Sequence, residues 1–181
     1  VGDGHRWPLR EQFLKMLQLR VDARDLALVE LDAPVRQPTC FRDGSVVAGQ
    51  GACTNSDFAS QYELGGSYAP ICDFDLLMAA VESAGELGVK MPVGNLYSSD
   101  TFYDAAGRNM RFAKMGVMAV EMEAAGLYCT AAYTGKRALA ICSISDNLVN
   151  GTELSADERQ STFTNMMKIA LEVAVKMAAK K

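Results

Sequence analysis

The sequence predicts an α/β fold, and residues 117–147 support this most directly. A short apolar run at 117–120 is followed by helical spacing over 121–133, a stop at Gly135 and a second apolar run at 138–144. A strand, a helix and a strand in this order predict two parallel neighbouring strands with the helix across one face. The chain elsewhere shows the same alternation of apolar runs and amphipathic stretches.

The other expected elements are taken in chain order. They are a helix over 10–20, a strand over 26–31, a strand from 46 that ends in a glycine-bearing turn (SVVAGQGACT), a helix over 73–87, a strand over 90–97 and a last helix from the capping box Ser155-x-x-Glu158. Gly88 would end the helix over 73–87. Its expected core-facing stripe is Phe74, Leu77, Met78, Val81, Ala84 and Leu87. The stripe of the last helix is Phe163, Met166, Ala170, Val173 and Met177.

The composition indicates a globular protein of one domain and argues against several other classes of protein. The 181 residues are enough for one domain with a sizeable core, and 49% hydrophobic with 22% charged residues is ordinary for a globular protein. The net charge of −4 argues against a nucleic-acid or anionic-membrane surface. Five scattered cysteines without a CxxC pair fit reduced thiols in a cytoplasmic protein, and the single histidine, His5, excludes a histidine-rich metal site. No metal or nucleotide cofactor is expected.

Two acidic clusters follow the two strands of the central unit. Glu121-Met122-Glu123 comes after the first strand and Ser145-Asp146 after the second. Open α/β sheets bind ligands at the carboxyl ends of their strands, so these carboxylates are candidate site residues. The alternative is that they are first-turn acids and a helix cap, which the helix dipole favours.

Several stretches, all in one order, resemble a known family. VEMEAAGLY, ICSISDN and ELSADERQSTF, preceded by GQGACTNS (49–56), ICDFDLL (71–77) and VGNLYSSDTFY (93–103), resemble the hexameric bacterial-type purine nucleoside phosphorylases of the nucleoside phosphorylase superfamily. The resemblance covers about 46–181. It implies one three-layer α/β/α domain with a mixed central sheet, whose N-terminal half could be incomplete.

The resemblance also implies the roles of the site residues. Glu123 would hold the ribose hydroxyls, and Asp146 would be the general acid for the purine. From the sequence itself, Arg159 on the first turn of the last helix is a candidate to pair with Asp146 across the connecting loop, and the alternative is a solvated surface residue. The remaining residues implied for substrate binding are Met122, Glu121, Val120, Phe102 and Ser145. For Phe102, simple burial in the core is the alternative.

These roles fit the chemistry of cleaving a purine N-glycosidic bond, which leaves positive charge on the sugar and negative charge on the base. A carboxylate such as Glu123 accepts strong hydrogen bonds from hydroxyls and stabilises a sugar cation. Asp146 must carry a proton to act, although a free aspartic acid has a pKa of about 3.9. Burial would raise the pKa. We hypothesise that Arg159 approaches as the helix start closes and drives that proton to N7.

The segment 1–45 differs from the rest. It holds six of the chain's ten arginines but one lysine, and the family resemblance fades there. Extending the family pattern back without gaps places Glu30 where a phosphate-binding arginine belongs. Gly2 and Arg10, in a grouping similar to the family's phosphate turn, are weak candidates for the phosphate site. We therefore expect a divergent N-terminal segment (1–45) attached to a phosphorylase-like region (46–181).

Three functions compete on these observations. The first is reversible phosphorolysis of purine nucleosides, with inorganic phosphate as co-substrate and no cofactor. The second is hydrolysis of purine nucleosides, in which water replaces phosphate. The third is a non-catalytic nucleoside-binding subunit that lacks the phosphate site. The resemblance further implies a cytoplasmic homohexamer built as a trimer of dimers.

Overall fold

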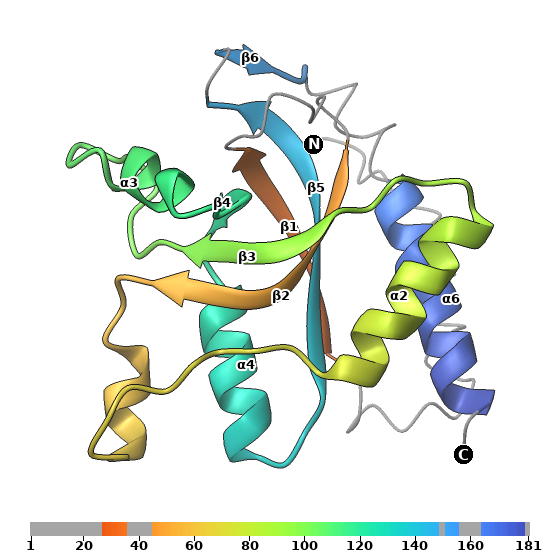
Figure 1. Ribbon diagram of the computed structural model, residues 1–181, viewed down its shortest axis with the longest axis horizontal. Helices are drawn as coiled ribbons and strands as arrows, with labels where there is room; N and C mark the ends of the chain where they lie inside the picture. Colours follow the sequence, from red (N-terminus) through yellow and green to blue (C-terminus); the bar gives the residue numbers. More distant parts are fainter. Residues whose placement is uncertain (1–26, 36–44, 149–150, 156–163, 180–181) are drawn as a thin grey trace, which may run out of the picture.

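The computed structural model describes residues 27–35, 45–148, 151–155 and 164–179 (Figure 1). Strands and helices alternate between residues 93 and 147, as the sequence predicts for an α/β fold. The strands are β1 (Ala27–Val35), β2 (Val46–Thr54), β3 (Val93–Ser98), β4 (Ala119–Glu121), β5 (Ala138–Asn147) and β6 (Thr152–Glu153). The helices are η1 (Phe58–Tyr62), α2 (Phe74–Glu86), α3 (Arg108–Lys114), α4 (Ala124–Tyr133) and α6 (Thr164–Ala179).

The strands form one mixed sheet of six, in the order β1-β4-β3-β2-β5-β6, and β1 also pairs with β5. The pairings therefore run in a closed circuit through β1 to β5. Strands β2, β3 and β4 are parallel to one another, whereas β5 is antiparallel to β2 and parallel to β1. The fold is the predicted α/β class, with a mixed sheet between helices (Figure 1).

The expected side-by-side pairing of the strands around 117–120 and 138–144 is wrong. In the described part of the chain, β4 and β5 do not pair with each other; β1 lies between them. Val35 of β1 pairs with Ala119 on one side and with Asn147 on the other. The local pattern could not reveal this arrangement, because the intervening strand comes from about 90 residues earlier in the chain, counted from Ala27 to Ala119.

Strand β5 is buried on both faces, which explains its unbroken apolar sequence. Alternate residues face opposite sides. Leu139 and Ile141 pack with α2 and α6, whereas Ala138, Ala140 and Cys142 pack with α4. Strand β5 therefore contacts both helical layers, α4 on one face and α2 with α6 on the other.

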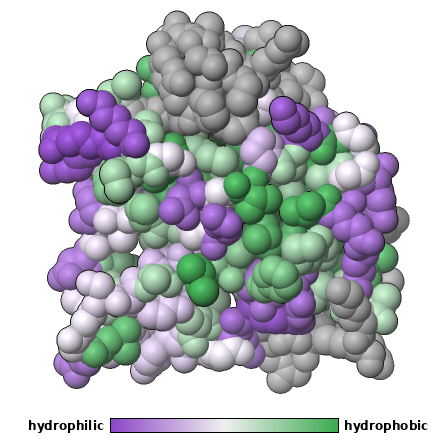
Figure 2. Space-filling view, viewed as in Figure 1, coloured by the Kyte–Doolittle hydropathy of each residue, from purple (hydrophilic) through white to green (hydrophobic). Residues whose placement is uncertain are grey.

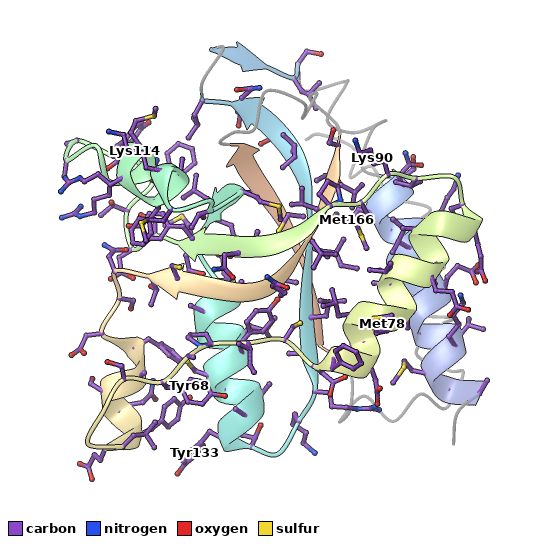
Figure 3. All side chains as sticks on the ribbon, in the orientation of Figure 1. Tyr68, Met78, Lys90, Lys114, Tyr133 and Met166 are labelled. Atoms are coloured by element: carbon purple, nitrogen blue, oxygen red, sulfur yellow. The ribbon has the colours of Figure 1, made fainter. Side chains whose placement is uncertain are left out.

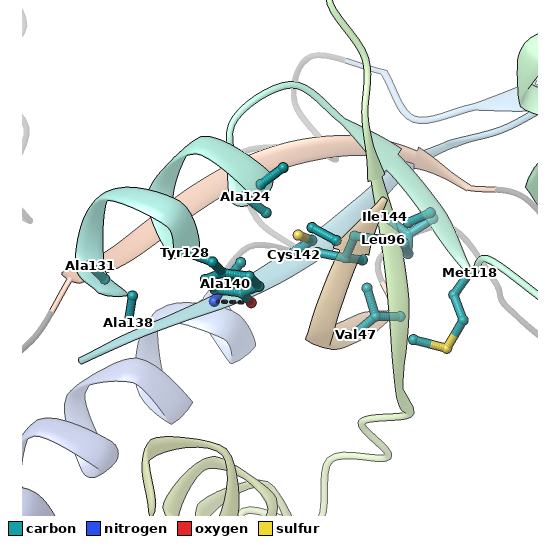
Figure 4. Packing of buried hydrophobic residues seen from close by; sticks show 13 residues of the cluster. Val47, Leu96, Met118, Ala124, Tyr128, Ala131, Ala138, Ala140, Cys142 and Ile144 are labelled. Carbon is teal, nitrogen blue, oxygen red and sulfur yellow. Dashed lines mark hydrogen bonds between the residues drawn. The ribbon is translucent and has the colours of Figure 1, made fainter. Parts of the chain in front are cut away.

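A buried tyrosine ties α4 to the sheet (Figure 4). The Tyr128 hydroxyl donates to the Gly49 carbonyl and accepts from the Ala140 amide at 3.0 Å. Gly49 has no room for a side chain, since a Cβ there would lie 2.5 Å from Leu96 Cδ1. A Cβ at Gly49 would also lie 3.1 Å from the Tyr128 hydroxyl oxygen, so the absence of a side chain there leaves room for this residue of α4 beside β2.

The bounds of the helix over 73–87 are confirmed. Asp73 is the N-cap of α2, and its Oδ1 accepts from the Leu76 amide at 2.9 Å. Gly88 follows the helix in the left-handed region, at φ 68°.

The stripe of α2 that was expected to be buried is wrong at four of its six positions; Ala84 is buried as expected, and Leu77 is half-buried against the core. Phe74, Met78, Val81 and Leu87 are exposed. The buried positions are Leu76, Ala79, Ala80, Ser83 and Ala84. Four of these five side chains are alanine or serine, so α2 packs closely against α6, and Lys176 of α6 forms ion pairs with Glu82 and Glu86 of α2. Figure 2 shows apolar side chains on the outer surface in the region of α2, and Figure 3 labels Met78 there.

The last helix is described from Thr164, so the capping box and Phe163 lie outside the described residues. Its buried face is Met166, Ile169, Val173, Ala174 and Met177. Three of the four expected residues that can be compared are in this set; Ala170 is half-buried.

The helix predicted over 10–20 also lies outside the described residues, and the boundary near residue 45 between a divergent segment and a phosphorylase-like region stays a prediction. No helix in the described ranges has the length and apolarity needed to span a membrane.

We predict that Leu76→Ala lowers the free energy of unfolding by about 2–5 kcal/mol, because it empties a fully buried position. Phe74→Ala, two residues away, should change it by less than about 0.5 kcal/mol, because that side chain is 71% exposed. Urea unfolding followed by circular dichroism measures both. The opposite order would show that the sequence-predicted stripe is the buried one.

Tyr128→Phe should lower the free energy of unfolding by about 1–3 kcal/mol, because it removes the hydroxyl that serves the buried Gly49 carbonyl and Ala140 amide. Tyr133→Phe, on the exposed end of the same helix, is the matched control and should leave stability unchanged. Equal losses in the two variants would contradict a role for the Tyr128 hydroxyl.

Candidate functional site

The parallel strands β2, β3 and β4 bring their carboxyl ends together. Thr54 pairs with Ser98, and Ser98 pairs with Glu121, so the last residues of the three strands lie side by side. The Thr54 hydroxyl also donates to the Ser98 carbonyl at 2.8 Å. Helix α4 begins at this edge. This is the position at which α/β folds gather polar groups around a ligand.

A cavity of about 960 Å³ opens beside this edge. It lies between the first half of α4, the ends of β2 and β3, and the segment 56–70 that carries η1. Figure 1 shows η1 beside α4, and Figure 3 labels Tyr68 and Tyr133 in the same region. The polar side of the wall includes Thr54, Asp100 and Glu123, and the apolar side includes Phe58 and Met122. The wall can therefore serve a ligand with both hydroxyl groups and an apolar face.

Glu123 and Glu121 are placed differently, although one residue separates them. Glu123 is exposed and lines the cavity, and its side chain makes no cap hydrogen bond to α4. Glu121 is 2% exposed and turns into the protein. There its Oε1 accepts from the Ser98 hydroxyl, and its Oε2 accepts from the amides of Glu123 and Ala124 at 2.8 and 2.7 Å.

The electrostatics of Glu121 follow from this environment. Burial raises the pKa of its carboxyl above the ordinary value of 4.5, while the hydrogen bonds from Ser98 and the two amides oppose part of that rise. The neighbouring charge of Glu123 adds to the rise. Neither glutamate lies in the first turn of α4: Glu121 ends β4 and accepts from the first amides of the helix, whereas Glu123 is the N-cap residue and faces the cavity.

The apolar residues that were expected to bind substrate also differ in exposure and position. Met122 is half-exposed and lines the cavity. Val120 is buried in a small cluster with Tyr97 and Val117. Phe102 is 73% exposed, so burial in the core of this chain is excluded, and it does not line the described cavity.

Asp146 and Ser145 lie at the end of β5, outside the described cavity. Ser145 is buried, and its hydroxyl donates to Asp146 Oδ2 at 2.8 Å. Through Val35, Asn147 at the end of β5 is two strand positions from Ala119 at the start of β4, which is roughly 10 Å at the usual strand spacing; β4 then runs antiparallel to β5. The structure therefore brings Glu123 and Met122 together in one wall and places Asp146 on a separate strand end.

Three candidates lie outside the described residues: Arg159, Gly2 and Arg10. The ion pair between Asp146 and Arg159 stays a prediction. Within the described ranges, no group of three or more His, Cys, Asp or Glu side chains could hold a metal.

Two features of this edge were not identified from the sequence. Ser98, which links β3 to Glu121 and α4, is the last residue of a strand. Ser98 directly follows a predicted apolar strand, so it could have been identified by the rule that polar residues at the carboxyl ends of strands are candidate site residues. Cys53 also lines the cavity, and burial raises its pKa, so its thiol is neutral near pH 7 and a poor nucleophile.

Comparison with known proteins identifies the family. The model of the phosphorylase superfamily matches residues 39–179. A purine nucleoside phosphorylase of DeoD type from Tolumonas auensis is 40% identical over 173 residues, which is 95% of this chain and 72% of that protein. A protein of the same name from Listeria welshimeri is 38% identical over 176 residues, or 97% of this chain and 75% of the relative.

These matches extend further towards the N-terminus than residue 46, where the resemblance was expected to begin. Another DeoD-type relative, from Actinobacillus pleuropneumoniae, is 39% identical over 95% of this chain and 71% of its own length. The extent of the family match, together with the α/β fold, gives one conclusion. The chain belongs to the phosphorylase superfamily.

Proposed function

We propose that this chain is a purine nucleoside phosphorylase. It would catalyse the reversible reaction of purine (2'-deoxy)ribonucleosides with phosphate, giving the free base and (deoxy)ribose 1-phosphate. The observation that carries the proposal is the 40% identity, over 95% of the chain, to a relative named for this activity. The relative is matched over 72% of its own length, so the likeness concerns most of the enzyme and not one motif.

In this proposal Glu123 holds the sugar. Its carboxylate is exposed at the cavity wall, which leaves both oxygens available to hydroxyl donors. Met122, beside it on the same wall, offers an apolar surface to the ribose face. As the glycosidic bond breaks, the negative charge of Glu123 stabilises the developing sugar cation. Val120, Phe102 and Ser145 remain candidates for the base pocket.

Asp146 is the proposed general acid. It would donate a proton to purine N7, so that the base leaves as a neutral species. Arg159 would assist by pairing with the carboxylate as the proton departs. Asp146 already accepts from Ser145, so its orientation is constrained before substrate binds. Glu123 and Asp146 follow different strands, so in this proposal they would contact the sugar and the base at the two ends of the nucleoside.

The remaining expectations belong to the same proposal. The reaction would need inorganic phosphate as co-substrate and no other cofactor, with Gly2 and Arg10 as weak candidates for its site. The protein would be a cytoplasmic homohexamer, in which a neighbouring subunit completes each site. The substrates contain no nucleic acid or lipid.

We predict that the protein releases base from inosine or adenosine only when inorganic phosphate is present. Release is measured by chromatography of the free base, with and without phosphate. Equal release of base without phosphate would indicate that the protein hydrolyses nucleosides instead of phosphorolysing them. Binding of the nucleoside without release of base would indicate a nucleoside-binding subunit. A sample that neither binds nor cleaves either nucleoside would contradict the proposal altogether.

Asp146→Asn should lower kcat by about a hundredfold or more, because the amide cannot donate the proton as an acid does. Glu123→Gln should mainly raise KM and reduce kcat/KM, because a neutral amide binds hydroxyls less strongly and does not stabilise a cation. Asp75→Asn, an exposed change on α2, is the control and should leave both constants unchanged. Wild-type kcat in Asp146→Asn would remove Asp146 from the mechanism.

A further inference from the structure

The start of α4 is held by residues that precede it. The first amides of a helix have no partner within the helix, and they usually bond to the side chain of the N-cap residue. In α4 the N-cap residue is Glu123, and its side chain makes no such bond. The amides of Glu123 and Ala124 donate to Glu121 instead, and the amide of Ala125 donates to the Ser98 hydroxyl at 2.8 Å.

Glu121 and Ser98 form a single buried unit. The Ser98 hydroxyl donates to Glu121 and accepts from Ala125, so one side chain is the donor and the other the acceptor. Both are almost fully buried, at 2% and 4% exposure. The main chain adds a further link, because the Ser99 amide donates to the Glu121 carbonyl at 2.7 Å. The ends of β3 and β4 and the first turn of α4 are therefore fixed to one another.

This arrangement leaves the carboxylate of Glu123 free of a structural task while fixing its backbone. Its own amide is one of those bound by Glu121. A side chain that must place two acceptor oxygens on a sugar depends on such support, because a displacement of about 1 Å can cost a hundredfold in rate. Glu121 is too deeply buried to reach a ligand in the cavity itself.

We infer that Glu121 and Ser98 are positioning residues for Glu123, and that Glu121 is not itself a substrate ligand. This inference rests on the proposed function, in which Glu123 binds the sugar. It differs from the role expected for Glu121 from the sequence, where it was grouped with the substrate-binding residues. Glu121 acts on the substrate only through Glu123.

The experiment is a double-mutant cycle with Glu121→Ala and Glu123→Ala, read as kcat/KM on inosine or adenosine with phosphate. Glu121→Ala alone should lower kcat/KM by about tenfold or more. In the Glu123→Ala background it should have almost no further effect, because the group it positions is gone. Multiplicative losses in the double mutant would overturn the inference.

Two control variants test whether the effect of Glu121 on activity comes from positioning Glu123, from the charge of Glu121 or from a general loss of stability. Glu121→Gln keeps an acceptor for the amides and a group that can bond to Ser98, so it should retain most of the activity; a loss equal to that of Glu121→Ala would overturn the inference. Asp73→Ala removes the corresponding cap of α2, remote from the cavity. It should lower thermal stability without changing KM, and a matching rise in KM would count against the inference.

Two further readouts cover the cases in which the main cycle fails. If Glu121→Ala does not fold, Ser98→Ala takes its place in the cycle with the same expectation. If the wild-type protein binds inosine without cleaving it, the proposed function fails, and the cycle is then read from the dissociation constant of inosine. An absence of both binding and turnover would overturn the inference as well, because it requires Glu123 to contact a sugar.

Discussion

A buried carboxylate must find hydrogen-bond donors, and this requirement organises the candidate site. Glu121 is removed from water at the end of β4, where an unpaired charge would be costly. It obtains its donors from the start of α4 and from Ser98. The same bonds satisfy amides that α4 could not satisfy alone. One interaction thus meets the needs of the acid and of the helix, and fixes where the helix begins.

The closed circuit of strand pairings decides what else can lie near this point. Because β1 pairs antiparallel with β4 and parallel with β5, the two strands that lead to the acidic clusters are not neighbours and run in opposite directions. A ligand that contacted both would have to be elongated, with different groups at its two ends. A nucleoside has this form, and the two carboxylates would meet its sugar and its base separately.

The layers on either side of β5 and β2 hold these strand ends in place. On one side α4 approaches closely because Gly49 has no side chain, and Tyr128 joins the helix to β2 and β5. On the other side α2 and α6 share a core cluster through Leu76 and alanines of α2, and Phe74 and Met78 stay outside. Close packing on both faces limits how far the strand ends can move.

The sequence by itself determined the local features. Asp73 and Gly88 bound α2, Gly135 follows α4 at φ 64°, and the apolar run at 138–144 indicated the strand β5. Family motifs pointed to Glu123 and Asp146 as candidates. These signals depend on neighbours within a few residues, so they can be read along the chain.

Tertiary structure alone decided three other matters. It chose the Leu76 face of α2 over the Phe74 face, because both have helical spacing and only the contact with α6 distinguishes them. It placed β1 between β4 and β5, a pairing between segments far apart in sequence. It also turned Glu121 inward and Glu123 outward, because the donors that attract Glu121 include Ser98, which is 23 residues away on another strand. Long-range partners set each of these outcomes, and no local pattern contains them.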